Sequence, residues 1–380
     1  MRASDAAMES RGAAAAMGAA GMASRRMFRV GVVVACLVAG ACATTKPGVP
    51  FTTDSSLSVP VRDERARFRE IYCAVLDAHG RSLPEYRPCD DALTLVGTEP
   101  VGMHRPVGLG PSKRGLVAFL VPGIGYECFK PWLQPLDTAA AHVRQYGYDL
   151  KVLDVDALSG TARNARQIRD AVMAMPADAQ VPRLVLIGYS KGTPDILEAV
   201  VAYPEIRTRI AAVVSVAGAV GGSALANDAE QYQADLLRHF PGATCESGDG
   251  GSVESLRPAT RHAWLATHAL PTDVPFYSVA TFPQPERIST ILKSSYRKLA
   301  KIDARNDSQM IYYDQIVPGS TLVGYLNADH WAVAVPISRT HPMVASMFVT
   351  QNAYPREALL EALLRFVEED LAAGSTNAVP

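Results

Sequence analysis

The chain reads LVLIGYSKG over residues 184–192, and this stretch decides its fold. The four apolar residues at its start predict a short buried strand. Residues 193–203 (TPDILEAVVAY) predict a helix with Pro194 in its first turn, where a missing N–H is tolerated. A G-x-S-x-G turn between a strand and a helix leaves the serine hydroxyl exposed at the top of a sheet. Ser190 is therefore the candidate nucleophile, and the N–H of Lys191 points at the same spot.

Two glycines flank this serine. Gly188 and Gly192 are expected to keep side chains out of the place where the strand and the helix nearly touch. The turn is sharp, and we expect it to strain the backbone of Ser190.

Strands and helices alternate on both sides of this stretch. Most predicted strands are continuous apolar runs, which is typical of a parallel sheet covered on both faces. The sequence therefore predicts an α/β fold with a mostly parallel central sheet and helices on both faces. The predicted strands cover residues 116–121, 150–155, 184–187, 210–216, 274–280 and 321–326. The predicted helices cover residues 135–146, 162–174, 193–203, 286–301 and 356–372.

Other segments fall outside this alternation. Residues 221–272 contain two amphipathic pieces, at 232–240 and 260–270, and predict a cap inserted over the carboxyl edge of the sheet. Residues 63–77 place apolar side chains on one face of a helix. The expected parts are a leader over 1–42, a tether and N-terminal arm over 43–112, and a main domain over 113–375 with its cap at about 221–272.

The start of the chain predicts export. Arg25, Arg26 and Arg29 precede an apolar run at residues 30–39, which is too short to span a membrane comfortably. A basic flank, a short apolar run and small residues are typical of a signal peptide.

The signal ends in Ala39-Gly40-Ala41-Cys42, which resembles the lipobox of bacterial lipoproteins. The resemblance implies that Cys42 is lipidated, although Ala39 stands where leucine is commonest. It implies a lipid-anchored protein of the bacterial cell envelope. Ala43 is not the inner-membrane aspartate, which favours the outer membrane. The alternative is ordinary cleavage nearby, with Cys42 left as a spare thiol.

The remaining cysteines fit an oxidising compartment. Cys36 leaves with the signal and Cys42 is assigned to the lipid, so four remain, and these can pair in three ways. Cys73 and Cys89 lie in one short segment and are the natural pair, which leaves Cys128 for Cys245. The alternative is that some or all are buried free thiols.

The composition excludes one class of partner. Lys and Arg number 37 against 38 Asp and Glu, and a net charge of −1 gives no electrostatic reason to expect nucleic acid. No Cys/His cluster has the spacing of metal ligands, and we expect neither a metal nor another cofactor.

A nucleophilic serine needs a base, and the base needs an orienting carboxylate. His330 directly follows the last predicted strand, as a base at the carboxyl edge should, and is the candidate base. Asp307 and Asp314 are comparable candidates for the acid from spacing alone. Asp303 instead reads as the solvated end of a basic helix.

The turn at Ser190, the order Ser190, Asp307, His330, and the pair Asn306-Asp307 resemble the α/β-hydrolase superfamily, especially bacterial lipases and esterases. That family carries an N-D-G turn at the acid, so the resemblance favours Asp307, although Ser308 stands where glycine is common. It covers residues 113–370 and leaves the N-terminal arm outside. It implies an α/β-hydrolase fold with a cap and a Ser190, Asp307, His330 catalytic triad.

An acyl-transfer site also needs oxyanion donors. Lys191 would supply one N–H. The resemblance places the other in the loop 121–126, at Ile124, with Gly125 as a near rival.

The expected function is a serine hydrolase that cleaves carboxylic esters, small or lipid, through an acyl-enzyme on Ser190. One alternative is an envelope acyltransferase that uses the same residues. Another is a non-catalytic envelope binding lipoprotein that keeps a hydrolase fold.

Overall fold

The computed structural model describes residues 61–132, 136–156, 158–176, 183–229, 246 and 248–376. Its centre is a seven-stranded sheet in the order β1-β7-β6-β5-β4-β2-β3, and all its pairings are parallel. This confirms the predicted parallel α/β sheet. The strands are β1 (Arg62–Asp63), β2 (Val117–Val121), β3 (Asp149–Val152), β4 (Leu184–Tyr189), β5 (Ile210–Val216), β6 (Phe276–Thr281) and β7 (Thr321–Leu326).

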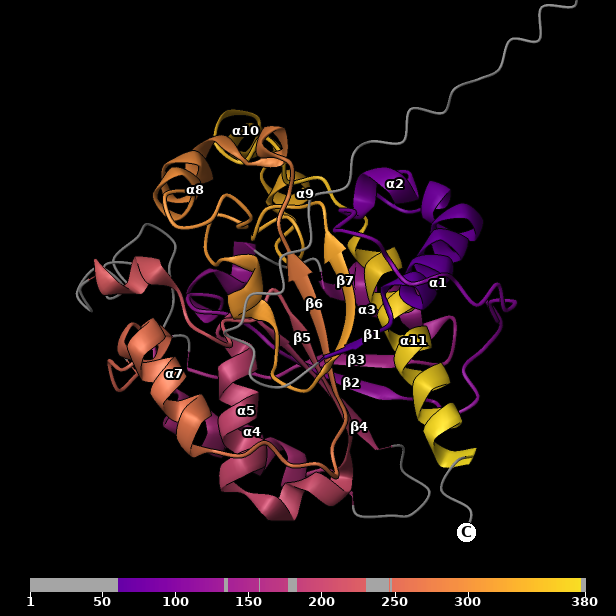
Figure 1. Ribbon diagram of the computed structural model, residues 1–380, viewed down its shortest axis with the longest axis horizontal. Coiled ribbons are helices and arrows are strands. Elements are labelled where there is room, and N and C mark those ends of the chain that lie inside the picture. Colours follow the sequence, from indigo (N-terminus) through magenta and orange to yellow (C-terminus); the bar gives the residue numbers. More distant parts are fainter. Residues whose placement is uncertain are drawn as a thin grey trace, which may run out of the picture. The chain divides into compact units, whose positions relative to one another are not determined.

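Helices cover both faces of the sheet (Figure 1). On one face α1, α3 and α11 enclose a core that includes Phe68, Val143 and Leu363, and on the other α4 and α5 enclose a second core. Strands β4, β5, β6 and β7 are buried along their whole length, which explains their unbroken apolar runs. The helices are α1 (Arg65–Ala78), α2 (Cys89–Ala92), α3 (Leu136–Arg144), α4 (Thr161–Met173), α5 (Gly192–Ala202), α7 (Pro258–Thr267), α8 (Lys293–Leu299), α9 (Ile337–Thr340), α10 (Pro342–Met347) and α11 (Arg356–Thr376).

One predicted helix is wrong in its extent. Residues 286–301 do not form a single helix: two short 3-10 turns, Pro285–Arg287 and Thr290–Leu292, precede the shorter α8. The break has a cause distant in the sequence, because the N–H of Ser289 donates to the carboxylate of Asp329 (2.9 Å) rather than to a helix carbonyl.

The N-terminal arm is attached to the sheet and to the last helix. Strand β1, which the sequence did not predict, pairs with β7, and α1 packs against α11. The predicted disulfide between Cys73 and Cys89 is confirmed. Cys128 is also disulfide-bonded, whereas its expected partner Cys245 lies outside the described residues.

The cap and the leader are described only in part. The second amphipathic piece of the expected cap forms α7, whereas residues 232–240 lie outside the described residues, as do the leader, Cys42 and the tether. The expected domain boundaries therefore stay predictions. Within the residues that the structure covers, none of the helices combines the length and apolarity that a membrane span requires.

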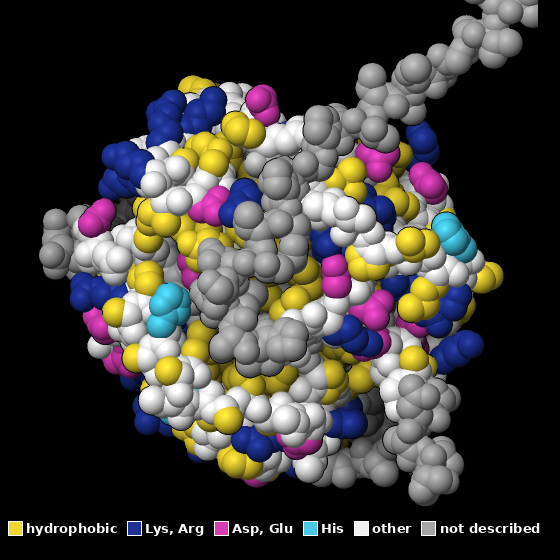
Figure 2. Space-filling view, viewed as in Figure 1, with side chains coloured by type: hydrophobic (Ala, Val, Ile, Leu, Met, Phe, Trp, Pro, Cys, Tyr) yellow, Lys and Arg dark blue, Asp and Glu magenta, His cyan; other side chains and the backbone are white. Residues whose placement is uncertain are grey.

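Acidic and basic side chains are interspersed on the face drawn in Figure 2. Neither sign forms a continuous field there, in keeping with the net charge of −1.

Candidate active site

Ser190 occupies the sharp turn between β4 and α5. Its φ is +54°, a left-handed conformation that costs a non-glycine residue energy. A Cβ on Gly188 would lie 2.6 Å from Thr193 Cα, and one on Gly192 would collide with the carbonyl oxygen of Val121. The expected strain at the serine and the need for both glycines are thus confirmed.

Ser190, His330 and Asp307, here called the serine cluster, lie in one hydrogen-bonded row. His330 Nε2 is 3.0 Å from Ser190 Oγ, and His330 Nδ1 is 2.8 Å from Asp307 Oδ2. The serine follows β4, the histidine follows β7, and the aspartate lies between α8 and β7. The parallel sheet brings the three together because the carboxyl ends of β4 and β7 lie at the same edge.

The prediction that the Ser190 hydroxyl is exposed is wrong. Ser190 is 8% exposed, and the histidine and aspartate are 4% and 0% exposed. Two neighbours account for this: His330 contacts the hydroxyl, and a Cβ on Gly123 would lie 2.8 Å from Ser190 Cβ. The loop after β2 therefore closes against Ser190.

The carboxylate of Asp307 is fixed by neutral donors. Thr281 Oγ1 donates to Oδ2 (2.7 Å), while the N–H groups of Gln309 and Met310 donate to Oδ1 (2.9 and 2.8 Å). The N–H of His330 also donates to the carbonyl of Asp307 (2.9 Å). These bonds leave Oδ2 aimed at the imidazole and set its distance.

Ser308, which stands where the family commonly has glycine, follows Asp307 in the same turn. This residue has a φ of +80°, in the region that favours glycine. Its hydroxyl is buried and has no hydrogen-bond partner among the described residues. Ser308 therefore adopts a backbone conformation that favours glycine. Its hydroxyl makes no hydrogen bond with the described residues that would offset the strain.

His330 is positioned from two sides. Tyr189 stacks on its ring, with centroids 5.1 Å apart, and the Tyr189 hydroxyl donates to the His330 carbonyl (2.7 Å). The neighbouring Asp329 accepts from the N–H groups of Ser289 and Ala332 (2.9 Å each). Burial raises the pKa of the Asp329 carboxyl although these bonds oppose the shift.

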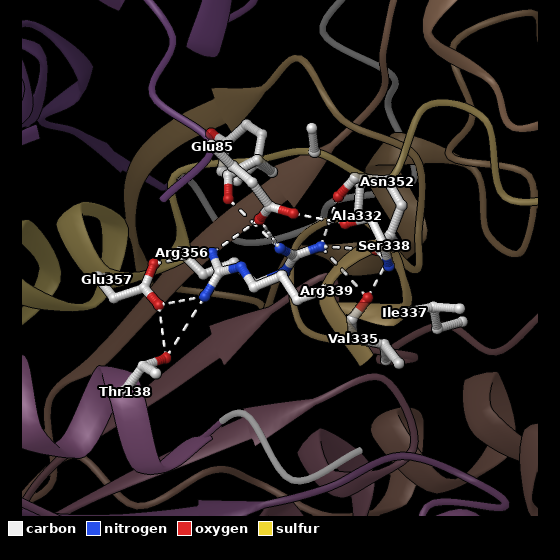
Figure 3. Close-up of polar contacts among 12 residues, drawn as sticks. Glu85, Thr138, Ala332, Val335, Ile337, Ser338, Arg339, Asn352, Arg356 and Glu357 are labelled. Atoms are coloured by element: carbon white, nitrogen blue, oxygen red, sulfur yellow. Dashed lines mark hydrogen bonds and ion pairs between the residues drawn. The ribbon is translucent and has the colours of Figure 1, made fainter. Parts of the chain in front are cut away.

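A charged network fixes the segment that follows the histidine (Figure 3). Arg339, on α9, donates to Glu85 of the arm (2.7 Å) and to Glu357 of α11 (3.0 Å). Arg356 also donates to Glu85. The arm and the last helix thereby hold the chain a few residues beyond His330.

The other two acid candidates lie elsewhere. Asp314 Oδ1 is 3.7 Å from His262 Nε2, and its carbonyl accepts from the N–H of Gly221 (2.8 Å). Asp303 pairs with Arg305 at 2.5 Å. Of the three aspartates, it is Asp307 that contacts His330.

The expected oxyanion donors adjoin the serine. Lys191 immediately precedes α5, so its N–H belongs to the amides at a helix start that lack partners within the helix. Ile124 and Gly125 follow Gly123 in the loop that closes against Ser190, and Gly125 has a φ of +76°.

Sequence reasoning missed the buried support beneath this turn. Lys191 Nζ pairs with Asp195 (2.8 Å), which also accepts from Asn164 (2.8 Å). Burial raises the pKa of Asp195, whereas the ammonium and the amide act in the opposite direction. The Lys-x-x-x-Asp spacing on a helix was the available signal. The sequence did not identify Thr281, because a threonine at the end of a predicted strand does not reveal which carboxylate its hydroxyl will contact.

An apolar cavity lies beside Tyr189, between the sheet and α11. Its walls include side chains from β2, β4 and β5, from the segment after His330 and from α11, among them Leu120, Ile187, Val216, Val333, Leu359 and Leu363.

Known structures resemble this one. The metagenomic carboxyl esterase MGS0156 is 40% identical, with a TM-score of 0.77, over 86% of this chain and 97% of that one. The chain therefore belongs to the carboxyl esterases of the α/β-hydrolase fold. Weaker matches are Bacillus licheniformis lipase BlEst2 (17% identity, TM-score 0.48, 66% and 96% coverage) and EstA from Clostridium botulinum (10%, 0.47, 79% and 98%). No protein-family model and no curated protein matches the chain.

The likeness to this esterase extends beyond the predicted region. A match over 86% of the chain is longer than residues 113–380 and must include part of the N-terminal arm. The expectation that the arm lies outside the resemblance is therefore wrong for this relative. Its attachment to β7 and α11 gives the reason: the arm completes the sheet and one core.

Proposed function

We propose that the chain is a serine hydrolase of carboxylic esters that forms an acyl-enzyme on Ser190. The observation that carries this proposal is the continuous row from Ser190 Oγ through both nitrogens of His330 to Asp307 Oδ2, at 3.0 and 2.8 Å. A hydroxyl needs a base within this reach, and the base needs a carboxylate that selects its tautomer.

The first half-reaction transfers the acyl group to the enzyme. His330 Nε2 takes the hydroxyl proton as Ser190 Oγ bonds to the ester carbonyl carbon. The carbonyl oxygen becomes an oxyanion that accepts from the N–H groups of Lys191 and Ile124. When the ester C–O bond breaks, the imidazolium gives its proton to the departing alkoxide, and Asp307 stabilises the imidazolium throughout.

The second half-reaction returns the enzyme to its starting state. His330 takes a proton from water, and the hydroxide bonds to the acyl carbon. The bond to Ser190 Oγ then breaks, the serine recovers its proton, and a carboxylic acid leaves. No proton or electron is gained or lost by the enzyme over the cycle.

A relative, rather than the cavity, supports the substrate class. The cavity beside Tyr189 has mainly aliphatic walls that also include Arg356 and Glu357, and no residue of the serine cluster is among its lining residues. The esterase that shares 40% identity with the chain supports the ester-hydrolase class.

Labelling with a fluorophosphonate tests the proposal. The reagent phosphonylates an activated serine, so it should modify wild type at Ser190, located by peptide mapping, and abolish turnover of a short-chain nitrophenyl ester. Ser190→Ala should resist the label and lose turnover, whereas the control Ser346→Ala, on the exposed α10, should behave as wild type. Labelling elsewhere, or turnover by Ser190→Ala at the wild-type rate, would overturn the assignment.

We further propose that Cys42 carries a lipid that anchors the protein in the bacterial cell envelope, with the outer membrane favoured. The supporting observation is the run Ala39-Gly40-Ala41-Cys42 after a short apolar segment. Mass spectrometry of the mature chain should find an acylated N-terminal Cys42. Cys42→Ser should release the protein from membranes, whereas Cys36→Ser, within the signal, should not; an unmodified mature wild type contradicts the anchor.

A further inference from the structure

Two imidazoles and one carboxylate converge on a point between α1, α3 and α11. His79 Nδ1 lies 3.0 Å from Glu361 Oε2, and His142 Nε2 lies 2.7 Å from the same oxygen. The ligating atoms of the three residues all lie within 4.8 Å of one another. We call His79, His142 and Glu361 the arm cluster.

The arm cluster joins three separate elements. His79 directly follows α1, His142 lies on α3, and Glu361 lies on α11. Tyr146 stacks on the ring of His79 at 4.7 Å and meets the ring of His142 edge-on at 5.3 Å. Both imidazoles are therefore oriented by packing as well as by the carboxylate.

The second oxygen of the carboxylate, Oε1, lies 3.1 Å from His79 Nδ1 and also meets Arg365. Arg365 Nε donates to Glu361 Oε1 at 2.7 Å. The remaining nitrogens of Arg365 donate to the carbonyls of Gly108, Leu109 and Gly110 at 2.8 to 2.9 Å, so its charge is shared with that loop. Oε2 thus faces both imidazoles, while Oε1 is oriented by Arg365 in addition to its contact with His79, and ligating carboxylates usually have such an outer partner.

We propose that the arm cluster binds a divalent transition-metal ion, with zinc as the ion that its ligands fit. His79 Nδ1, His142 Nε2 and Glu361 Oε2 would be the protein ligands, since two imidazoles and a carboxylate are a ligand set that zinc uses. Tetrahedral zinc with bonds of about 2.0–2.1 Å separates its ligand atoms by about 3.3 Å. The present nitrogen–oxygen spacings of 2.7 and 3.0 Å need to widen by a few tenths of an ångström, whereas the two imidazole nitrogens, which lie within 4.8 Å of each other, need to approach by up to about 1.5 Å.

The fourth position would be taken by water. The His142 and Glu361 side chains are 6% and 0% exposed, whereas that of His79 is 19% exposed, so solvent reaches the cluster on the His79 side. Zinc requires imidazole nitrogens without protons, so each N–H that faces Glu361 must move to the other ring nitrogen or leave to solvent. Zinc affinity should therefore fall as the pH is lowered.

The bound ion would link the arm to the main domain. Its ligands come from α1 on one side and from α3 and α11 on the other, so metal that binds the folded chain stabilises this junction. The arm cluster shares no residue with the serine cluster, so its test is independent of ester turnover.

Zinc binding to the mature, untagged chain tests the site. The protein is dialysed against a chelator and then titrated with zinc by calorimetry, with thermal unfolding and ester turnover measured in parallel. We expect one equivalent of zinc per chain and a rise of several degrees in Tm. Cobalt(II) in place of zinc should give the intense visible bands of tetrahedral coordination.

Matched variants locate the ion. His79→Gln and His142→Gln should each weaken zinc binding by at least about 100-fold, since loss of an outer partner alone costs 10–100-fold. The control His268→Gln, an exposed histidine at the end of α7, should bind as wild type. Wild type that binds no zinc and gives no cobalt spectrum, or His79→Gln that binds as tightly as wild type, would show an ion-paired cluster only and overturn the proposal. The cobalt spectrum of wild type decides the matter even where a variant fails to fold.

Discussion

The described part of the chain contains two buried clusters in which a carboxylate holds an imidazole, and they differ in what else the carboxylate contacts. The contact is 2.8 Å from Asp307 to His330 and 2.7 Å from Glu361 to His142. Asp307 otherwise accepts from a hydroxyl and two backbone N–H groups, on a turn. Glu361 accepts from a second imidazole and a guanidinium, on a helix.

This difference shows how one pair of residue types can serve two purposes. Neutral donors leave the charge of Asp307 available to stabilise the cation that the proposed mechanism would form on His330, and the far nitrogen of that ring meets a hydroxyl. In the arm cluster Arg365 already partners the carboxylate, and both imidazoles contact Glu361 Oε2, with His79 Nδ1 also 3.1 Å from Oε1. The serine cluster is a linear row along which a proton can move, whereas the side chains of the arm cluster converge on one point.

The largest effect is expected from Asp307→Asn. The amide keeps the shape, removes the charge and favours the wrong tautomer of His330, so turnover near neutral pH should fall about 10⁴-fold with little loss of stability. Steady-state hydrolysis of a nitrophenyl ester and thermal unfolding measure the two quantities. Asp314→Asn is the control and should mainly lower stability; the reverse pattern would move the acid to Asp314.

The corresponding change in the arm cluster should act on stability instead. Glu361→Gln leaves Arg365 without its charged partner in a buried place, and breaking such a pair costs about 3 kcal/mol of unfolding free energy. Chemical denaturation measures this loss, and turnover per folded molecule should stay at the wild-type value. A loss of turnover in the folded fraction would contradict the separation of the two clusters.

The loss of unfolding free energy in Glu361→Gln should depend on pH, which further separates the arm cluster from the serine cluster. Burial would raise the pKa of Glu361, but hydrogen bonds from His142, Arg365 and His79 outweigh it and hold the pKa below its ordinary value. The stability it contributes is therefore present above the unfolded pKa of about 4.3 and is lost as the pH falls through the folded value. The difference between wild type and Glu361→Gln should shrink in acid; a constant difference would refute the ionised role.

A smaller effect is expected at the neutral donor of the serine cluster. Thr281→Val keeps the shape but removes the hydroxyl that donates to Asp307 Oδ2 at 2.7 Å. One hydrogen bond to a charged group is worth about 1.5 kcal/mol, so turnover should fall about 10-fold. Thr290→Val, outside the cluster, should hydrolyse the ester as wild type does, and equal rates in both variants would show that the hydroxyl does not support Asp307.

The smallest effect concerns the turn on which Asp307 lies. Ser308→Gly relieves the left-handed backbone at φ +80° and removes a buried unpaired hydroxyl, so unfolding free energy should rise by about 1 kcal/mol. Urea denaturation measures the change. Ser295→Gly, on α8, should instead lose stability, and destabilisation by Ser308→Gly would mean that the serine is required by the turn.

The sequence predicted best what depends on local order. The strand before Ser190 and the glycines beside it follow from periodicity and from steric crowding, and the position of His330 follows from the end of a strand. The disulfide between Cys73 and Cys89 was predictable because both lie in one short segment. The acid needed a family resemblance, since a polar turn does not show which way its carboxylate points.

The features that were missed depend on distant partners. The two-residue β1 exists because β7 offers it an edge, and the helix expected over 286–301 breaks because Asp329 captures an N–H. The arm cluster assembles from positions 79, 142 and 361, which no spacing rule connects.

The pairing of β1 with β7 sets an order of events during synthesis. Arg62 lies 259 positions before its partner Thr321, and α1 also packs against the still later α11. At about 5–20 residues per second, the ribosome needs on the order of tens of seconds to make that interval. During this time α1 has neither of these partners for Phe68, Ile71 and Tyr72. The arm is thus made first but docks last, and a chain stalled before β7 would present that apolar helix face to chaperones and proteases.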